Sequence, residues 1–312
     1  MNRREFAKTL GAAAVAMGIG KHVSGSENIS PQFAITIDDF AWHNAVHLTA
    51  EDRNRAILDV LSANRAKAAL FVVGAMVDSE ERGKNLLRFW GEAGHIIGNH
   101  TYSHRSLNST ISAAEYEQDI SRAEEVLKEF KQFRKVFRYP LLKEGNTAVK
   151  RDHVRAFLKQ KGYRIGHVTI DTSDWIVDQR LVARLQKDPH ADVKPYRDFY
   201  LAHMWDRARY YDALAKQVLG RRVKHTILTH FNLLNGLFLG DLIEMFKRKG
   251  WQLIDAEEAF TDSVFRAEPK TVPAGESIVW ALAKEKGTIP RSLRYPAEDG
   301  EYENAKMDKL GL

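Results

Sequence analysis

The chain has 312 residues, of which 44% are apolar and 28% charged, so it can form one large domain or two small ones with a sizeable core. Its formal charge of +6 suits anionic polymers or membrane surfaces, but no Arg-rich recognition helix or RNA-binding signature is present, and we expect no nucleic-acid partner. Because cysteine is absent, disulfides and thiolate metal sites are excluded, and any metal must be held by His, Asp or Glu.

The first 25 residues have the pattern of an export signal. The pair Arg3-Arg4 is followed by Phe6, Lys8 and a short apolar run over residues 10–19, which resembles a twin-arginine signal peptide. The run is too short to span a membrane. We therefore expect export to the periplasm by the twin-arginine machinery, with no stable membrane span after processing. An ordinary amphipathic leader helix is the alternative.

Strand and helix patterns alternate along the rest of the chain. Strands are predicted at residues 33–35, 69–73, 95–99, 136–137, 163–170, 225–229 and 251–254. Helices are predicted from residue 49 to about 61, around 86–90, and at 113–130, 149–161, 195–219 and 242–249. This alternation predicts parallel βαβ units in a barrel or an open α/β sheet. The tail from Thr261 onward has one predicted helix, around residues 278–283, and the sequence assigns it no chemistry.

An Asp-Asp pair follows the first predicted strand. Two adjacent carboxylates at the end of a buried strand repel each other unless a metal or another cation shares the site. The pair Asp38-Asp39 therefore predicts one metal ligand and one base. An exposed turn that caps a helix is the alternative.

Two imidazoles follow the third predicted strand. His100 and His104 are four residues apart, so on a helix or tight turn they could share one face and bind one divalent ion. No Glu follows the first His, which excludes the zinc-protease helix. Two His and one carboxylate would make a three-ligand site with open positions, as hydrolytic metals require. Five other histidines are interpreted as surface or packing residues: His22, His47, His153, His190 and His203.

Five motifs in this chain resemble, in order and rough spacing, those of the polysaccharide deacetylases, also called NodB-homology deacetylases or carbohydrate esterase family four. The motifs are Asp38-Asp39, His100 to His104, Arg138 to Leu141, Asp174-Trp175 and Leu228-Thr229-His230. The resemblance covers about residues 32–260. It implies a distorted (β/α) barrel with about seven parallel strands, a catalytic domain at residues 30–260, and an extension at 261–312 that packs on the barrel.

The resemblance also implies how the metal site is built. Asp39, His100 and His104 would hold one divalent cation, with zinc preferred and Co²⁺, Mn²⁺, Ni²⁺ or Fe²⁺ as alternatives. Asp38 would take a proton from water, and Arg138 would hold Asp38 through a charge-assisted pair.

The remaining roles implied by the resemblance concern the leaving group and the acetyl pocket. His230 would be the general acid for the leaving amine, with its imidazolium favoured by Asp174. The backbone N–H of Leu141 would stabilise the oxyanion, and Trp175 and Leu228 would line the acetyl pocket. Structural alternatives are a surface arginine at 138, a helix N-cap at 174 and a core tryptophan at 175.

Two positions depart from the family pattern. Phe40 stands where most members have Gly, and Leu141 replaces the usual aromatic residue, so we expect a different loop after the Asp pair and one wall fewer in the sugar groove. Asp171 could orient a loop. His43 and Phe231-Asn232 are expected near the mouth of the site, where they could contact substrate.

The function implied by the resemblance is a metal-dependent removal of N- or O-acetyl groups from a saccharide, such as a cell-wall glycan or an amino-sugar oligosaccharide. A hydrolase of other amides or esters is one alternative. A catalytically silent glycan-binding protein on the same barrel is another. Asp38 and His230 favour an enzyme, because binding alone requires neither a base nor an acid.

Overall fold

The computed structural model describes residues 30–78, 80–287 and 300–312. The expected export signal, with Arg3, Arg4 and His22, lies outside these residues. None of the helices in the described part of the chain combines the length and apolarity needed to cross a membrane.

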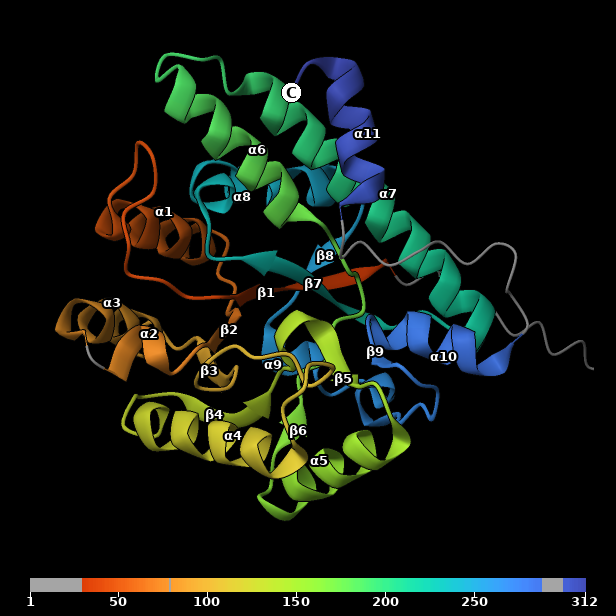
Figure 1. The fold of residues 1–312 in the computed structure, drawn as a ribbon. Coiled ribbons are helices and arrows are strands. Elements are labelled where there is room, and N and C mark those ends of the chain that lie inside the picture. Colours follow the sequence, from red (N-terminus) through yellow and green to blue (C-terminus); the bar gives the residue numbers. More distant parts are fainter. Residues whose placement is uncertain (1–29, 79, 288–299) are drawn as a thin grey trace, which may run out of the picture.

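Seven parallel strands form the central sheet (Figure 1). Their order is β6-β4-β3-β2-β1-β7, and β8 also pairs with β1. The strands are β1 (Gln32–Asp38), β2 (Ala69–Val72), β3 (Ile96–Asn99), β4 (Phe133–Phe137), β6 (Arg164–Ile165), β7 (Lys224–His230) and β8 (Gln252–Leu253). The register aligns Asp38 with Phe71 on one side and with His230 on the other, so these strand ends meet at one edge.

The segment after β6 closes the sheet into a distorted barrel. Gly166 N–H donates to the carbonyl of Phe137 in β4. Ile170 instead pairs with β7: its N–H donates to the carbonyl of Thr226, and its carbonyl accepts from Leu228 N–H. The prediction of one strand over residues 163–170 is therefore wrong in length, because the chain changes its pairing partner after two strand residues. The predicted barrel with seven parallel strands is confirmed.

The barrel interior is packed around Phe71. The Arg138 guanidinium lies over this ring, 3.9 Å from its centroid. A methyl group at Gly98 or Gly166 would come within 2.8 or 2.5 Å of the same ring, so both positions require glycine. The interior is a filled core, and ligands can bind only at its ends.

Helices surround the strands, with α4 and α5 on one side and α6, α7, α8 and α11 (Glu301–Leu310) on the opposite side (Figure 1). The helices of the barrel are α1 (Ala50–Ala63), α2 (Ala75–Asp78), α3 (Glu81–Glu92), α4 (Ala113–Leu127), α5 (Ala148–Gln160), α6 (Asp174–Lys187), α7 (Lys194–Leu219), α8 (Leu233–Arg248) and α9 (Ala256–Ala259). A capping box begins α4, because the side chains of Ser112 and Glu115 each accept from the other's backbone N–H.

Two of the longer barrel helices differ from the prediction, and the helices α2, α9 and α11 were not predicted. No helix was predicted at α6, whose start lies in the polar run Asp171 to Asp174, although Ile176, Val177, Leu181 and Leu185 form its buried face. The start of α8 was predicted at residue 242, whereas the helix begins at Leu233. Glycines at 236 and 240 weaken the helical pattern of that segment.

The tail packs against several parts of the barrel. The short strand β9 (Ala274–Gly275) pairs antiparallel with β5 (Lys143–Gly145), which follows the turn Pro140–Leu142. The helix α10 (Ile278–Lys286) contacts α7, and α11 (Glu301–Leu310) contacts α6. Arg180 of α6 donates to Asp308 and to the carbonyl of Leu312.

Candidate active site

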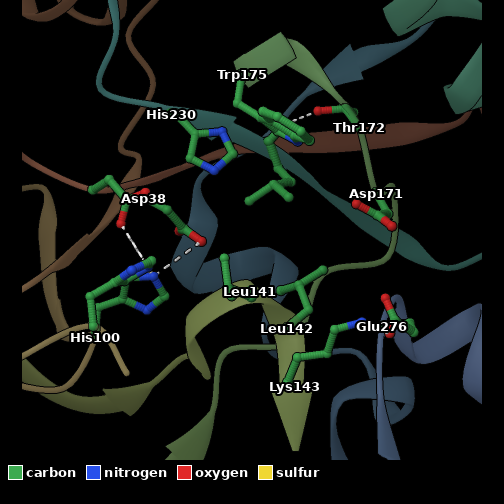
Figure 2. A pocket seen from close by; sticks show the side chains of 13 residues that line it. Asp38, His100, Leu141, Leu142, Lys143, Asp171, Thr172, Trp175, His230 and Glu276 are labelled. Carbon is green, nitrogen blue, oxygen red and sulfur yellow. Dashed lines mark hydrogen bonds and ion pairs between the residues drawn. The ribbon is translucent and has the colours of Figure 1, made fainter. Parts of the chain in front are cut away.

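A cavity of about 480 Å³ lies at the edge where the strands end (Figure 2). Eight of the ten predicted site residues line it: Asp38, Asp39, His100, His104, Leu141, Trp175, Leu228 and His230. The other two, Arg138 and Asp174, are buried behind it at 1% and 0% exposure. Five further residues complete the lining: Leu142, Lys143, Asp171, Thr172 and Glu276.

Asp39, His100 and His104 converge on one point of this cavity. The Asp39 Oδ1 atom lies 3.1 Å from His104 Nε2 and 3.6 Å from His100 Nε2. Each of the three residues offers one ligand atom, and these atoms lie within 4.8 Å of one another. That spacing lets a single ion contact all three.

The loop that carries the two histidines holds an uncommon backbone conformation. Thr101 and His104 have φ of 63° and 56°, and Asp39 has φ of 60°. Such values cost a residue other than glycine about 1–3 kcal/mol and are found where the surrounding structure imposes them. The two imidazoles therefore face each other across an irregular loop, not along the helix that their spacing allows.

The protonation of His100 suits a metal ligand. Its Nδ1–H donates to the carbonyl of Arg138 at 2.9 Å, which leaves the Nε2 lone pair facing Asp39. Burial lowers the pKa of His100, and this effect outweighs the opposing charges of Asp38 and Asp39. The ring is therefore neutral, as metal binding requires.

The residues present fit a divalent cation. Asp39 Oδ1 and His104 Nε2 are buried atoms that face each other without a hydrogen-bond partner among the described residues. Burial alone would raise the pKa of Asp39, but the two imidazoles outweigh it and hold the pKa below its ordinary value. One carboxylate and two imidazoles form a ligand set for zinc and related ions. Burial opposes the charged form of His104, but Asp39 outweighs it and raises the pKa of this ring, so an ion that binds here must displace a proton from His104.

Asp38 lies beside the three ligand atoms and has a different partner. Arg138 Nη1–H donates to Asp38 Oδ1 at 2.7 Å and also to Thr36 Oγ1 at 2.9 Å. Arg138 Nε–H donates to the carbonyl of Gly166, so the guanidinium is fixed on both sides. The second oxygen of Asp38 lies 3.8 Å from His100 Nε2 and stays on the pocket side.

His230 approaches the pocket from β7. Its Nδ1–H donates to Asp174 Oδ1 at 2.6 Å, and Asp174 also accepts from the backbone N–H of His230 and from Asn235 Nδ2. Burial opposes the charged ring, but the Asp174 carboxylate outweighs it and raises the pKa of His230 to about 10. The imidazolium can therefore donate a proton from Nε2.

Three residues expected near the mouth of the site lie outside the cavity lining: His43, Phe231 and Asn232. Phe231 is buried and packs on Phe40 with their ring centroids 5.0 Å apart, while Asn232 caps α8 by accepting from Asn235 N–H. His43 is exposed and stacks on Trp42. None of these three residues lines the cavity, and their contact with substrate stays a prediction.

The other histidines lie on the surface or in the core. His47, His153 and His190 are exposed. His203 is buried, and its Nε2 accepts from the backbone N–H of Ser173 at the start of α6. His22 lies outside the described residues.

Sequence reasoning missed Leu142, Lys143, Thr172 and Glu276. No motif marks the two residues after Leu141, and Glu276 lies in the tail to which the sequence assigns no chemistry. Asp171, considered only as a loop-orienting residue, is 2% exposed and lines the cavity. Its carbonyl accepts from Arg207 Nε–H, which holds this loop against α7.

The chain is similar in sequence to known polysaccharide deacetylases. The family described as polysaccharide deacetylase matches residues 26–166. A chitin deacetylase from Colletotrichum lindemuthianum is 30% identical over 183 residues, which are 54% of this chain and 69% of that enzyme. A peptidoglycan-N-acetylglucosamine deacetylase from Bacillus cereus is 29% identical over 119 residues, or 38% of this chain, and the match spans only 40% of that relative.

The fold also has a counterpart among solved structures. A CE4 family pseudoenzyme from Bacillus anthracis superposes with a TM-score of 0.51 at 18% sequence identity. The alignment covers 74% of this chain and 65% of that chain. This likeness concerns the fold alone.

Proposed function

The chain belongs to the polysaccharide deacetylase family, and we propose that it is a metal-dependent hydrolase that removes N- or O-acetyl groups from a saccharide. One observation carries the proposal. Asp39, His100 and His104 converge within 4.8 Å, while the neighbouring carboxylate of Asp38 is held apart by Arg138. This is the division between ligand and base that metal-assisted hydrolysis requires.

Asp39, His100 and His104 would hold one divalent cation, with zinc preferred. When bound, such an ion supplies a Lewis acid that polarises the acetyl carbonyl and acidifies a water molecule. His100 contributes a lone pair fixed by its bond to the Arg138 carbonyl, so the Arg138 residue supports both the ligand and the base.

Asp38 and His230 carry the two proton transfers. Asp38 takes a proton from water, and the resulting hydroxide attacks the acetyl carbon. His230, protonated by virtue of Asp174, gives its Nε2 proton to the nitrogen or oxygen of the sugar as the bond to the acetyl carbon breaks. The products are acetic acid, which releases its proton to solvent as acetate, and the free amine or alcohol. The proton on Asp38 then returns to His230 through solvent, which restores the Asp38 carboxylate and the His230 imidazolium.

Leu141, Trp175 and Leu228 shape the acetyl site. The backbone N–H of Leu141 would donate to the oxyanion that forms at the acetyl carbonyl. Leu141 has φ of 55°, and its side chain is 59% exposed at the rim of the cavity. Trp175 and Leu228 supply an apolar wall against the methyl group.

A screen for acetate release tests this function. Purified protein, loaded with Zn²⁺ or treated with chelator, is incubated with chitooligosaccharides, peptidoglycan fragments and acetylated xylan. We expect release from at least one glycan only in the metal-loaded sample. Glycan binding without any acetate release would instead support a silent binding protein. Hydrolysis of simple amides or esters with no glycan turnover would support a different hydrolase.

The compartment is a separate proposal that rests on the N-terminal pattern Arg3-Arg4, Phe6 and Lys8. We propose that the protein is exported to the periplasm by the twin-arginine machinery and meets its glycan there. Replacing both Arg3 and Arg4 by Lys should retain the protein in the cytoplasm, as measured by cell fractionation. Export of the variant at the normal level would refute the assignment.

A further inference from the structure

The tail contributes a side chain to the cavity. Glu276 follows β9, and its backbone N–H donates to the carbonyl of Leu142 at 2.9 Å. This places Glu276 in the cavity lining next to Lys143, although 133 positions separate the two residues in the sequence. Residues from two distant segments thus build one wall of the candidate active site.

Lys143 and Glu276 form an ion pair on this wall. The Lys143 Nζ atom lies 2.6 Å from Glu276 Oε1, and the two side chains are 21% and 11% exposed. Figure 2 shows the Lys143 side chain directed at Glu276, beside Leu142 and on the side of the cavity where Asp171 lies. A pair this sheltered is fixed in position and presents N–H donors beside carboxylate acceptors.

The chemistry of the pair fits the hydroxyl groups of a sugar ring. Each hydroxyl donates one hydrogen bond and accepts others, so adjacent hydroxyls can use an ammonium and a carboxylate together. The two charges offset each other, so an acidic sugar gains no net attraction from the pair. Trp175 and Leu228 in the same cavity provide the apolar surface for the acetyl group.

We propose that Lys143 and Glu276 form a specificity-determining subsite for the hydroxyl groups of an uncharged sugar ring. The inference rests on the proposed function and deepens it, because it names neutral N-acetylated saccharides over acidic ones as the substrate class. It also gives the tail a role in recognition through Glu276.

Steady-state kinetics of the Zn²⁺-loaded full chain test the subsite. Glu276→Gln and Lys143→Gln are compared with wild type on three probes: N-acetylchitotetraose, an acidic fragment that contains N-acetylmuramic acid, and 4-nitrophenyl acetate, which has no sugar ring. Glu257→Gln is the matched control, because Glu257 forms an exposed ion pair with Arg164 outside the cavity.

Each subsite variant should raise KM for chitotetraose about tenfold, the effect of losing one hydrogen bond to a charged group. The kcat on this substrate and the rate with 4-nitrophenyl acetate should stay within about twofold of wild type, because the reacting groups are untouched. Glu276→Gln should also raise kcat/KM for the acidic fragment relative to kcat/KM for chitotetraose, since the neutral amide no longer offsets the positive charge of Lys143.

An unchanged KM for chitotetraose in both variants would overturn the subsite, and so would equal losses on chitotetraose and 4-nitrophenyl acetate. Either result leaves deacetylation itself intact. Absence of turnover by wild type on all three probes would contradict the proposed function and remove the subsite with it. Circular dichroism checks that each variant folds. If Glu276→Gln does not fold, the kinetics of Lys143→Gln alone decide whether the subsite exists.

Discussion

The adjacent aspartates show how neighbouring side chains acquire different tasks. Asp39 faces two imidazoles, whereas Asp38 accepts from the buried guanidinium of Arg138. The backbone turns between them, because Asp39 has φ of 60° directly after the last residue of β1. The Asp39 carboxylate is thereby directed at the ion site, whereas one oxygen of Asp38 is held by Arg138.

Replacing Asp38 by Asn should leave the metal in place and lower turnover by at least about a hundredfold, the effect of losing a general base. The amide oxygen can still accept from Arg138 but cannot take a proton from water. Metal content and the rate of acetate release measure the two effects, and thermal unfolding checks the fold. Asp198→Asn makes the same change on an exposed helix position and should behave as wild type. A near-normal rate in Asp38→Asn would remove its role as base.

His230→Ala should impair poor leaving groups most. Protonation of the departing amine limits amide cleavage, whereas an activated phenyl ester leaves without help. We therefore expect a large fall in kcat on N-acetylated sugars and a much smaller fall on 4-nitrophenyl acetate. Equal losses on the two substrate types would indicate that His230 does not act as the acid.

At the scale of elements, the contact between β5 and β9 holds the turn that carries Leu141 and Leu142. Both leucines have φ of 55°, and the tail bonds to Leu142 through the N–H of Glu276. Gly275 makes this contact possible. Its φ is 122°, and a Cβ there would lie 1.9 Å from the carbonyl oxygen of Leu142.

Gly275→Ala should therefore displace the Leu141 turn and lower kcat for deacetylation by about tenfold or more, as expected when an oxyanion donor moves. Gly287→Ala is the matched control. Gly287 also has positive φ, 63°, but a Cβ there meets nothing within 4 Å. Gly287→Ala should lower the free energy of unfolding by about 1 kcal/mol and leave kcat unchanged. Equal kcat in the two variants would contradict the role of the contact between β5 and β9 in holding the Leu141 turn.

The sequence predicts an element well when the signal is local. The strands that deliver Asp38, His100 and His230 are short buried runs followed by polar residues, and the structure places all three side chains at one edge. The segment after β6 was predicted poorly, because its change of partner from β4 to β7 is a tertiary event. Glu276 carries no local signal at all, since a two-residue strand pairs across more than a hundred positions.

At the scale of the whole molecule, a buried charge cluster joins distant parts of the barrel. Glu144 of β5 accepts from Arg155 of α5 at 2.7 Å and faces His167 Nδ1 at 3.4 Å, in the segment that closes the barrel. Burial alone would raise the pKa of Glu144, but His167 and Arg155 outweigh it and lower the pKa to about 2 from an ordinary 4.5.

This shift predicts a loss of stability in acid. The folded state binds fewer protons than the unfolded state, so the Glu144 contribution is complete above about pH 4.5 and lost as the pH falls toward 2. Glu144→Gln should be less stable than wild type at pH 7 by about 3–5 kcal/mol, since one partner of a buried pair is removed. The difference in urea midpoint between wild type and Glu144→Gln should be smaller at pH 3 than at pH 7. Both proteins are treated with chelator, so that metal release in acid cannot cause the change. An equal difference at both pH values would contradict the lowered pKa of Glu144.

The central claim is that Asp39, His100 and His104 hold a single divalent ion while Asp38 is left to act as base. The direct measurement is metal content, by elemental analysis and Zn²⁺ titration of chelator-treated protein. We predict one ion per chain in wild type and in Asp38→Asn, and none retained in His100→Ala, His104→Ala or Asp39→Ala. Full metal content in a folded His104→Ala or Asp39→Ala variant, or loss of metal in Asp38→Asn, would contradict it.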